Sequence, residues 1–147
     1  MTNIATSEPL VSVVIPFFQK SKGLINKCVA SIISQRDYDN YHVIVVDDGS
    51  PVSADSELAD ILSYSDKVTV IKQENSGPGA ARNRGLDNLP TQTKYVAFLD
   101  SDDWWEPEFL VSAVTALEAG NDLFFSDSQR FGFNESRFQW QASKNLN

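Results

Sequence analysis

Short apolar runs alternate with helical segments along this chain, and this alternation constrains its fold more than any other feature. Four runs rich in β-branched and aromatic residues predict buried strands, and the segments between them have helical periodicity. The predicted strands are Val11–Ile15, His42–Val46, Val68–Ile71 and Tyr95–Leu99. Strands that are apolar throughout and alternate with helices are typical of a parallel sheet covered on both faces. We therefore predict an α/β fold with a mainly parallel sheet flanked by helices.

The same pattern predicts the helices and the domain limits. Predicted helices cover Leu24–Ser34, Ser53–Leu62, Ala80–Leu86 and a segment from Pro107 to about Leu117, and a short fifth strand is predicted at Leu123–Phe125. Proline suits the first turn of a helix, which supports the start at Pro107. Residues 1–10 are expected to be extended or disordered, residues 11–130 to form one domain, and residues 131–147 to form a tail without a clear period.

Charge and composition exclude several classes of function. The chain has 147 residues and a formal net charge of −8, which argues against nucleic-acid binding because that needs clustered Lys and Arg. The single cysteine, Cys28, excludes an intrachain disulfide and is expected to be a buried core residue. Neither a signal peptide nor an apolar run of ~20 residues is found, so we expect a cytoplasmic location, in a longer parent at the cytoplasmic face of a membrane.

Unusual residues follow each of the four predicted strands. These are Pro16-Phe17-Phe18, Asp47-Asp48, Asn75-Ser76-Gly77 and Asp100-Ser101-Asp102-Asp103. A parallel sheet gathers the carboxyl ends of its strands at one edge, where ligands of such folds bind. We therefore expect these four segments to form one ligand site.

The acidic segment Asp100–Asp103 has three carboxylates within four residues. Like charges this close need a compensating cation, and hard oxygen ligands favour Mg²⁺ or Mn²⁺, which also bind substrate phosphates. The alternative is a solvated acidic turn, but the position at the end of a strand favours the metal. Asp47-Asp48-Gly49-Ser50 taken alone favours a β-turn, and its alternative is a carboxylate that accepts from a nucleobase or a ribose hydroxyl.

The segment Asn75–Gly85 places glycines before a helix. Main-chain N–H groups at a helix N-terminus attract phosphate, and Arg82 could add a forked donor. The dinucleotide-binding fingerprint is not met, because Arg82 stands where the third glycine belongs. Arg84 is expected to face solvent.

Together these segments resemble those of the inverting family 2 glycosyltransferases, whose fold is of the GT-A type. The resemblance runs from Val11 to about Asp127. Its segments are Val11–Pro16, Gln35, Asp47–Ser50, Asn75–Gly85 and Phe98–Asp103, the last of which matches the DxD motif of the family. The resemblance implies that residues 11–130 bind a nucleotide-diphosphate sugar.

The resemblance also implies a role for individual residues. Asp48 would bind the nucleobase, commonly uracil, in a pocket lined by Pro16 and Phe18. Arg82 would lie near the ribose or diphosphate, Asp100 would hold the ribose or a metal-bound water, and Asp102 would ligate Mn²⁺ or Mg²⁺. Gly77 and Ser101 complete the implied nucleotide site. The family often has tyrosine and asparagine where Phe18 and Gln19 stand here.

The family places its general base and its acceptor-binding elements beyond the segment that corresponds to Asn147. We therefore expect residues 131–147 to begin an acceptor-binding part, for a saccharide or lipid-linked acceptor, and the chain to stop before that part is complete. Asp47, Asp48, Asp100 and Asp102 would be engaged with nucleotide or metal, which leaves Asp127 as the candidate base within the chain. Self-association is expected through an exposed apolar surface formed by Phe131, Phe133, Phe138 and Trp140.

Other classes fit the acidic segments less well. A haloacid-dehalogenase-type phosphatase has its Asp-x-Asp after the first strand, and a receiver domain has its acidic pair there, whereas the acidic segment here follows the fourth. A non-catalytic nucleotide-binding or interaction module on the same fold remains the main alternative.

Overall fold

The computed structural model describes residues 9–129, which divide into two compact units between Val111 and Ser112. The first unit contains the sheet and every residue assigned below to a site. Within residues 9–129, no helix has the length and apolar character needed to span a bilayer. The predicted N-terminal segment up to residue 8 and the predicted tail, with Phe131, Phe133, Phe138 and Trp140, lie outside the described residues.

The first unit is built on a four-stranded parallel sheet in the order β3-β2-β1-β4. Its strands are β1 (Leu10–Phe17), β2 (Tyr41–Asp48), β3 (Val68–Gln73) and β4 (Thr93–Phe98). The predicted α/β fold with a mainly parallel sheet is confirmed, and each strand end lies within two residues of its predicted place. The central strands are the most buried, because helices cover them on both faces.

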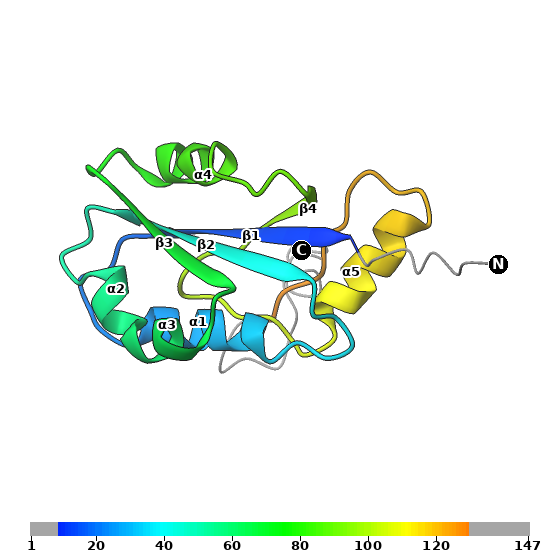
Figure 1. The fold of residues 1–147 in the computed structure, drawn as a ribbon, viewed down its shortest axis with the longest axis horizontal. Helices are drawn as coiled ribbons and strands as arrows, with labels where there is room; N and C mark the ends of the chain where they lie inside the picture. Colours follow the sequence, from blue (N-terminus) through cyan, green and yellow to red (C-terminus); the bar gives the residue numbers. More distant parts are fainter. Residues whose placement is uncertain (1–8, 130–147) are drawn as a thin grey trace, which may run out of the picture. The chain divides into compact units, whose positions relative to one another are not determined.

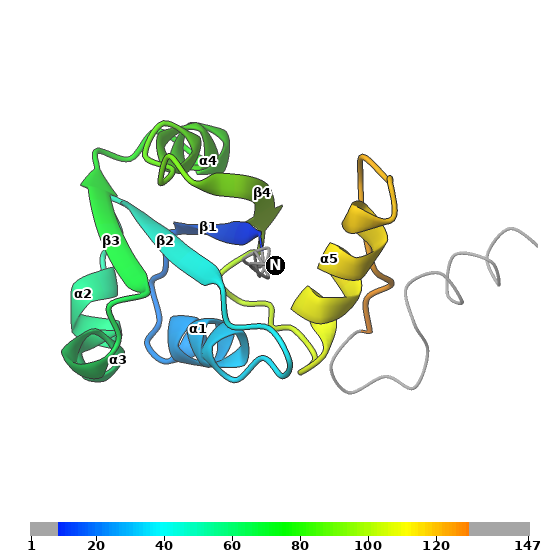
Figure 2. The ribbon, with the colours of Figure 1, turned by 45° about the vertical axis from the view of Figure 1, so that its right-hand side comes forward.

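Helices cover the two faces of this sheet unequally. Figures 1 and 2 show α1 (Leu24–Ile33), α2 (Ala54–Glu57) and α3 (Ala59–Tyr64) on one face and α4 (Pro78–Leu86) on the other. One helix was predicted where α2 and α3 stand, and the structure divides it at Leu58. Cys28 is fully buried on α1, as predicted. A further helix, α5 (Phe109–Glu118), begins in the first unit and ends in the second.

The predicted fifth strand is wrong, because Leu123–Phe125 is not in a strand. Leu123 and Phe125 are 75% and 72% exposed. Three apolar residues are too few to show a periodicity, and such a run does not distinguish a strand from a loop.

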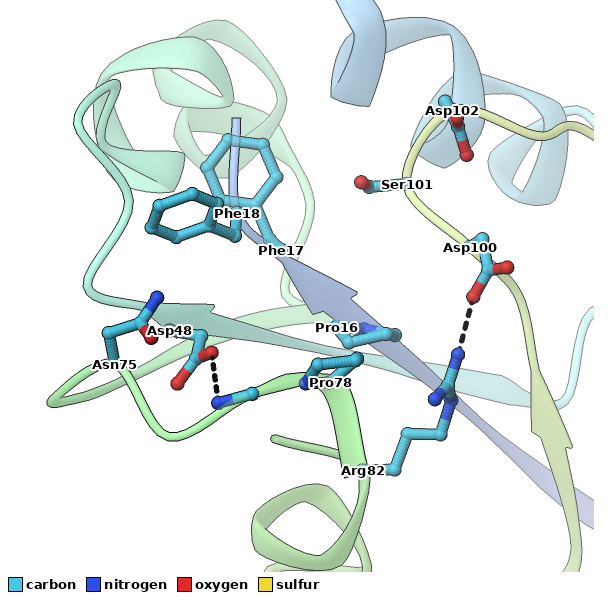
Figure 3. A pocket seen from close by; sticks show the side chains of 11 residues that line it. Pro16, Phe17, Phe18, Asp48, Asn75, Pro78, Arg82, Asp100, Ser101 and Asp102 are labelled. Carbon is cyan, nitrogen blue, oxygen red and sulfur yellow. Dashed lines mark hydrogen bonds and ion pairs between the residues drawn. The ribbon is translucent and has the colours of Figure 1, made fainter. Parts of the chain in front are cut away.

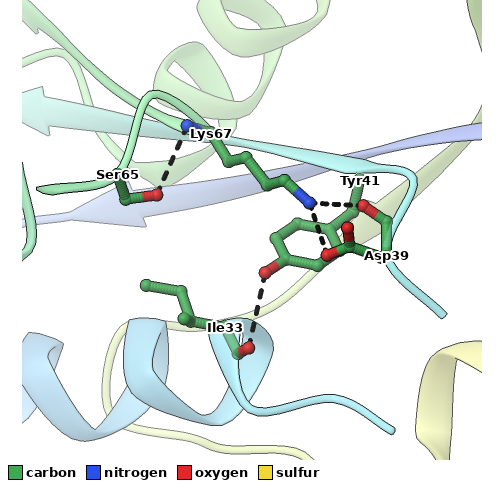
Figure 4. Close-up of polar contacts among 5 residues, drawn as sticks. All are labelled: Ile33, Asp39, Tyr41, Ser65 and Lys67. Atoms are coloured by element: carbon green, nitrogen blue, oxygen red, sulfur yellow. Dashed lines mark hydrogen bonds and ion pairs between the residues drawn. The ribbon is translucent and has the colours of Figure 1, made fainter. Parts of the chain in front are cut away.

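Lys67 links the segments that precede β2 and β3 through hydrogen bonds. The Lys67 ammonium donates to the main-chain oxygen of Asp39 at 2.6 Å and to its carboxylate, and lies 4.6 Å from the centre of the Tyr41 ring (Figure 4). The Tyr41 hydroxyl is 3.5 Å from the main-chain oxygen of Ile33, at the end of α1. These contacts hold the end of the sheet opposite to the predicted ligand site.

The register of the strands gathers their carboxyl ends. Phe17 of β1 is opposite Asp47 of β2, and Asp48 is opposite Gln73 of β3. On the other side of β1, Val14 is opposite Phe98, the last residue of β4. The predicted convergence of the strand ends at one edge of the sheet is therefore confirmed.

Close packing of α4 against β1 requires a glycine at residue 85. A Cβ atom added to Gly85 would lie 2.3 Å from a methyl group of Val14. Val14 is fully buried in the central strand, so it has little room to move away. This contact sets the distance between α4 and the sheet, and α4 carries Arg82.

We expect Gly85→Ala to lower the free energy of unfolding by about 1–3 kcal/mol, because overpacking at a rigid contact outweighs the better helix propensity of alanine. Gly79→Ala is the matched control, since an added Cβ there meets nothing within 4 Å. This control should be neutral or more stable by up to ~1 kcal/mol in urea unfolding. Equal stability of the two variants would contradict the assigned contact.

Candidate functional site

A pocket of about 470 Å³ lies at the carboxyl edge of the sheet, within the size range of small-ligand sites. It is formed by residues from the ends of β1, β2 and β4, from the loop after β3 and from α4. Its lining residues are Pro16, Phe17, Phe18, Asp48, Asn75, Gly77, Pro78, Arg82, Asp100, Ser101 and Asp102. All seven predicted nucleotide-binding residues and both predicted metal ligands line this one pocket. Phe17, Asn75 and Pro78 were not predicted as site residues, although each lies inside a motif that marked the site.

One wall of the pocket is apolar. Phe17 is buried at the end of β1 and anchors the chain there, whereas Phe18 is 42% exposed and has a ring available for contact. Pro16, Phe18 and Pro78 lie around this wall in Figure 3. A flat, partly exposed aromatic ring suits contact with a planar ligand group.

Asp48 organises the loop between β3 and α4. Its Oδ1 accepts from the Gln73 side-chain amide at 2.7 Å and from Ser76 N–H at 2.8 Å, and its Oδ2 accepts from Gly77 N–H at 2.9 Å. An ionised carboxylate has about four acceptor positions, so these bonds leave room for about one further donor. The structure thus gives Asp48 the local role expected of a turn aspartate and also places it on the pocket wall.

Hydrogen bonding keeps Asp48 ionised. Burial raises its pKa, but the bonds from Gln73, Ser76 and Gly77 together outweigh burial, and the pKa lies below its usual value of 3.8. The side chain is only 3% exposed and remains a carboxylate at neutral pH. It is therefore an acceptor for a ligand N–H or O–H group.

Asp47 has a structural role, and the prediction that it engages nucleotide or metal is wrong. Its side chain is buried, with Oδ1 accepting from Ser50 N–H at 2.8 Å and Oδ2 from Ala54 N–H at 2.9 Å. These bonds fix the turn after β2 and the first residue of α2. Adjacent strand residues point to opposite faces, so only one aspartate of the pair can face the pocket.

The N-terminus of α4 forms a second wall. Gly77 precedes the helix with φ of 90°, a conformation that favours glycine, and Pro78 is the first helical residue. The helix begins two residues earlier than predicted. Main-chain N–H groups of a first helical turn have no partner within the helix, so this end attracts negative charge.

Arg82 extends across the pocket from α4 to the loop Asp100–Asp103, which we call the acidic loop. Its guanidinium donates to Asp100 Oδ1 at 2.7 Å (Figure 3). Both side chains are partly exposed, and exposed ion pairs contribute about 0–1 kcal/mol, so a ligand can exchange for this contact at little cost. Arg84 is exposed and does not line the pocket, in agreement with its predicted position.

The acidic loop brings Asp100, Ser101 and Asp102 to the pocket. Burial raises the pKa of the Asp103 carboxyl, and the negative charges of Asp102 and Asp100 raise it further. Among residues 9–129, no three or more His, Cys, Asp or Glu side chains form a group that could hold a metal by themselves. The three carboxylates of the loop are therefore not a preformed cage.

The acidic loop nevertheless fits a Mg²⁺ or Mn²⁺ ion that shares its ligands with a substrate. Such ions are commonly held by one or two carboxylates together with substrate phosphates and water. Asp102 is exposed on the pocket wall, and Asp100 already attracts a cation in Arg82. The metal ligands that the protein offers are thus one or two carboxylates, and an arginine and a helix N-terminus lie beside them.

Helix α1 supports the acidic loop from below. The Cys28 thiol is 3.5 Å from the main-chain oxygen of Asp100, and Trp105 N–H donates to Ser31 Oγ at 3.1 Å. The Gln35 side chain donates to the Glu106 oxygen at 2.8 Å and accepts from Leu110 N–H at 2.8 Å, which gives this glutamine a fastening role. Burial and then the nearby aspartates raise the pKa of Cys28 to about 12, so it is a buried thiol and not a nucleophile.

Comparison with known proteins relates the whole arrangement to one family. The model of Glycosyl transferase family 2 matches residues 12–147. Succinoglycan biosynthesis protein ExoW of Rhizobium meliloti is 44% identical over 108 residues, which cover 73% of this chain and 34% of ExoW. Glycosyltransferase GlyA of Streptococcus pneumoniae is 35% identical over 127 residues, which cover 81% of this chain and 18% of GlyA.

A solved structure supports the same relationship. The crystal structure of S. aureus TarS 1–349 in complex with UDP-GlcNAc superposes with a TM-score of 0.63 at 30% identity, and covers 74% of this chain and 31% of that chain. The sheet and its helices thus have the GT-A, Rossmann-like fold. The present chain spans about a third of the length of ExoW and less than a fifth of GlyA.

We expect Asp48→Asn to lower the free energy of unfolding by about 2 kcal/mol near neutral pH, because the NH2 group that replaces one carboxylate oxygen cannot accept the N–H group bonded there. The folded pKa of Asp48 is below the unfolded value of about 3.9, so this stabilisation is complete above that value and is lost as pH falls through the folded pKa. The difference between variant and wild type should therefore shrink in urea unfolding at about pH 3.

The control is Asp66→Asn, at an exposed position before β3. A difference for Asp48→Asn that stays constant between about pH 7 and pH 3 would show that ionisation of Asp48 does not stabilise the fold.

Proposed function

Because this chain belongs to glycosyl transferase family 2, we propose that its pocket binds a nucleotide-diphosphate sugar, a UDP-sugar, together with Mn²⁺ or Mg²⁺, for inverting transfer to a saccharide or lipid-linked acceptor. One observation carries the proposal. A single pocket combines an apolar wall, an ionised acceptor, a helix N-terminus with Arg82, and the carboxylates of the acidic loop. Each of these groups suits one part of a nucleotide-diphosphate sugar.

The uracil base lies against the apolar wall in this proposal. Phe18 and Pro16 contact its faces, and the remaining acceptor position of Asp48 takes the base N–H. Three protein donors already hold this carboxylate in place, so binding of the base needs little reorganisation. Asp48 therefore both shapes the loop and reads the base.

The diphosphate lies between α4 and the acidic loop. The Gly77 N–H is already bonded to Asp48, so the first turn of α4 beyond Pro78 offers the main-chain N–H groups, and Arg82 turns from Asp100 toward a phosphate oxygen. In a chain with net charge −8, these groups and a bound cation make the pocket acceptable to a dianion. In this proposal Asp100 and Ser101, which line the pocket, contact the ribose or a water on the metal.

Asp102, with the second oxygen of Asp100, would hold the Mn²⁺ or Mg²⁺ ion. When bound, such an ion neutralises the diphosphate and acts as a Lewis acid for its departure from the sugar. The carboxylates of Asp102 and Asp100 would hold the ion, and the Arg82 guanidinium would add positive charge beside them.

The acceptor side is supported by the relatives and not by the pocket. ExoW is named for succinoglycan biosynthesis, and GgaA of Bacillus subtilis, 33% identical over 124 residues, for minor teichoic acid biosynthesis. Both names support a role in polysaccharide biosynthesis. We propose that the general base comes from a part of the protein outside residues 9–129. Asp127 stays a candidate, and it belongs to the second unit, where its carboxylate accepts from Ser128 N–H at 2.8 Å.

Calorimetry with UDP should show binding that is at least about tenfold tighter in Mn²⁺ than in EDTA, because an ion between Asp102 and the diphosphate adds charge-assisted contacts. Asp102→Asn should remove this difference and leave the metal-free melting temperature equal or slightly higher, since it relieves repulsion among the aspartates. Asp66→Asn, at the opposite edge of the sheet, should behave as wild type. Equal UDP affinity of the wild type in Mn²⁺ and EDTA would refute the metal assignment.

A further inference from the structure

Gln19 follows the apolar wall and makes hydrogen bonds to two other loops of the pocket edge. Its side-chain amide donates to Ser101 Oγ at 3.0 Å, in the middle of the acidic loop. Its main-chain N–H donates to Ser50 Oγ at 2.9 Å, and its main-chain oxygen accepts from Ser50 Oγ at 3.0 Å and from Val52 N–H at 3.2 Å. One residue thus joins the segments that follow β1, β2 and β4.

These bonds continue into the buried end of β2. Ser50, which holds the main chain of Gln19, is itself held by the buried carboxylate of Asp47 through its N–H group. A hydrogen-bonded path therefore runs from Asp47 through Ser50 and Gln19 to Ser101. The main-chain part of the path is fixed by several bonds, whereas the last step depends on one side chain.

The last bond of this path, from the Gln19 side chain, reaches Ser101, the residue between the two proposed metal ligands Asp100 and Asp102. Ser101 is only 5% exposed, and Figure 3 shows its hydroxyl directed away from the Asp100 carboxylate and toward the end of β1. A rotation of the main chain at Ser101 would turn both Asp100 and Asp102. The bond from Gln19 opposes that rotation, so it bears on the orientation of both carboxylates.

We infer that Gln19 is a positioning residue that couples the apolar wall of the pocket to the acidic loop. It does so by holding Ser101 in place for metal-assisted diphosphate binding. The inference rests on the proposed function, because it needs a nucleotide-diphosphate ligand that contacts both the apolar wall and the acidic loop. Gln19 is not among the residues that line the pocket, so it acts through Ser101. Binding of UDP without metal does not need this bond, whereas metal-assisted binding of the diphosphate does.

The length of the side chain is part of the assignment. Asparagine is shorter by one methylene, about 1.5 Å, and would leave a gap of about 4.5 Å to Ser101 Oγ, beyond hydrogen-bond range. Asparagine keeps the polar amide and leaves the main-chain bonds to Ser50 and Val52 in place. Gln19→Asn therefore removes the last step of the path alone, and Gln92→Asn, at an exposed turn before β4, is the matched control.

The test measures UDP affinity of the 147-residue chain by calorimetry, in Mn²⁺ and in EDTA. For Gln19→Asn we expect the Kd in Mn²⁺ to rise about fivefold, the effect of one neutral hydrogen bond, with the Kd in EDTA within about twofold of wild type. Gln92→Asn should match the wild type in both. Gln19→Ala should behave as Gln19→Asn, because both lack the bond to Ser101.

A double-mutant cycle with Ser101→Ala separates positioning from a general structural effect. In the Ser101→Ala background, Gln19→Asn should have no further effect on the Kd in Mn²⁺. A full fivefold effect in that background would overturn the inference, as would an equal change in Mn²⁺ and EDTA or no change in either. Wild-type chain that does not bind UDP would instead refute the proposed function.

Discussion

Parallel pairing of β1 with β2 on one side and β4 on the other is the constraint on which the rest of the structure depends. It brings the chain after Phe17, the Asp47-Asp48 turn and the acidic loop to one edge, although Gln19 and Ser101, for example, lie 82 residues apart in the sequence. Such pairing needs helical crossovers, and these place α1 below the acidic loop and α4 beside the pocket. The strand topology therefore sets the position of the site, and the individual residues then set its chemistry.

Hydrogen bonding to carboxylates then gives the pocket edge its shape. Asp47 fixes the turn after β2, and Asp48 fixes the loop before α4, each with main-chain N–H donors. The acidic loop is held differently, by Gln19 from one side, by α1 from below and by Arg82 across the pocket. A pocket with its walls fastened to one another in this way is largely preformed, and it leaves the ligand few groups to order.

Sequence patterns predicted the parts of this site that depend on periodicity and on strand ends. The four strands and their shared edge follow from runs of apolar residues ended by unusual ones. The roles of Pro16 and Asp48 were implied by the family resemblance, and Arg82 was indicated by the glycine-bearing segment before its helix. The patterns could not separate the two adjacent aspartates, because their roles depend on which face of β2 each occupies. They also did not predict the bond of Gln19 to Ser101, which is a tertiary contact between segments far apart in sequence. Leu123–Phe125 was too short a run to assign.

We propose that one pocket, at the ends of β1, β2 and β4, holds base, diphosphate and metal. A crystal of the chain with UDP and Mn²⁺ tests it most directly, through the anomalous scattering of manganese. We expect a manganese peak between the Asp102 carboxylate and the diphosphate, with uracil against Phe18 and within hydrogen-bond reach of Asp48. Manganese away from Asp102 and Asp100, or uracil bound elsewhere than on the wall of Phe18 and Pro16, would contradict it.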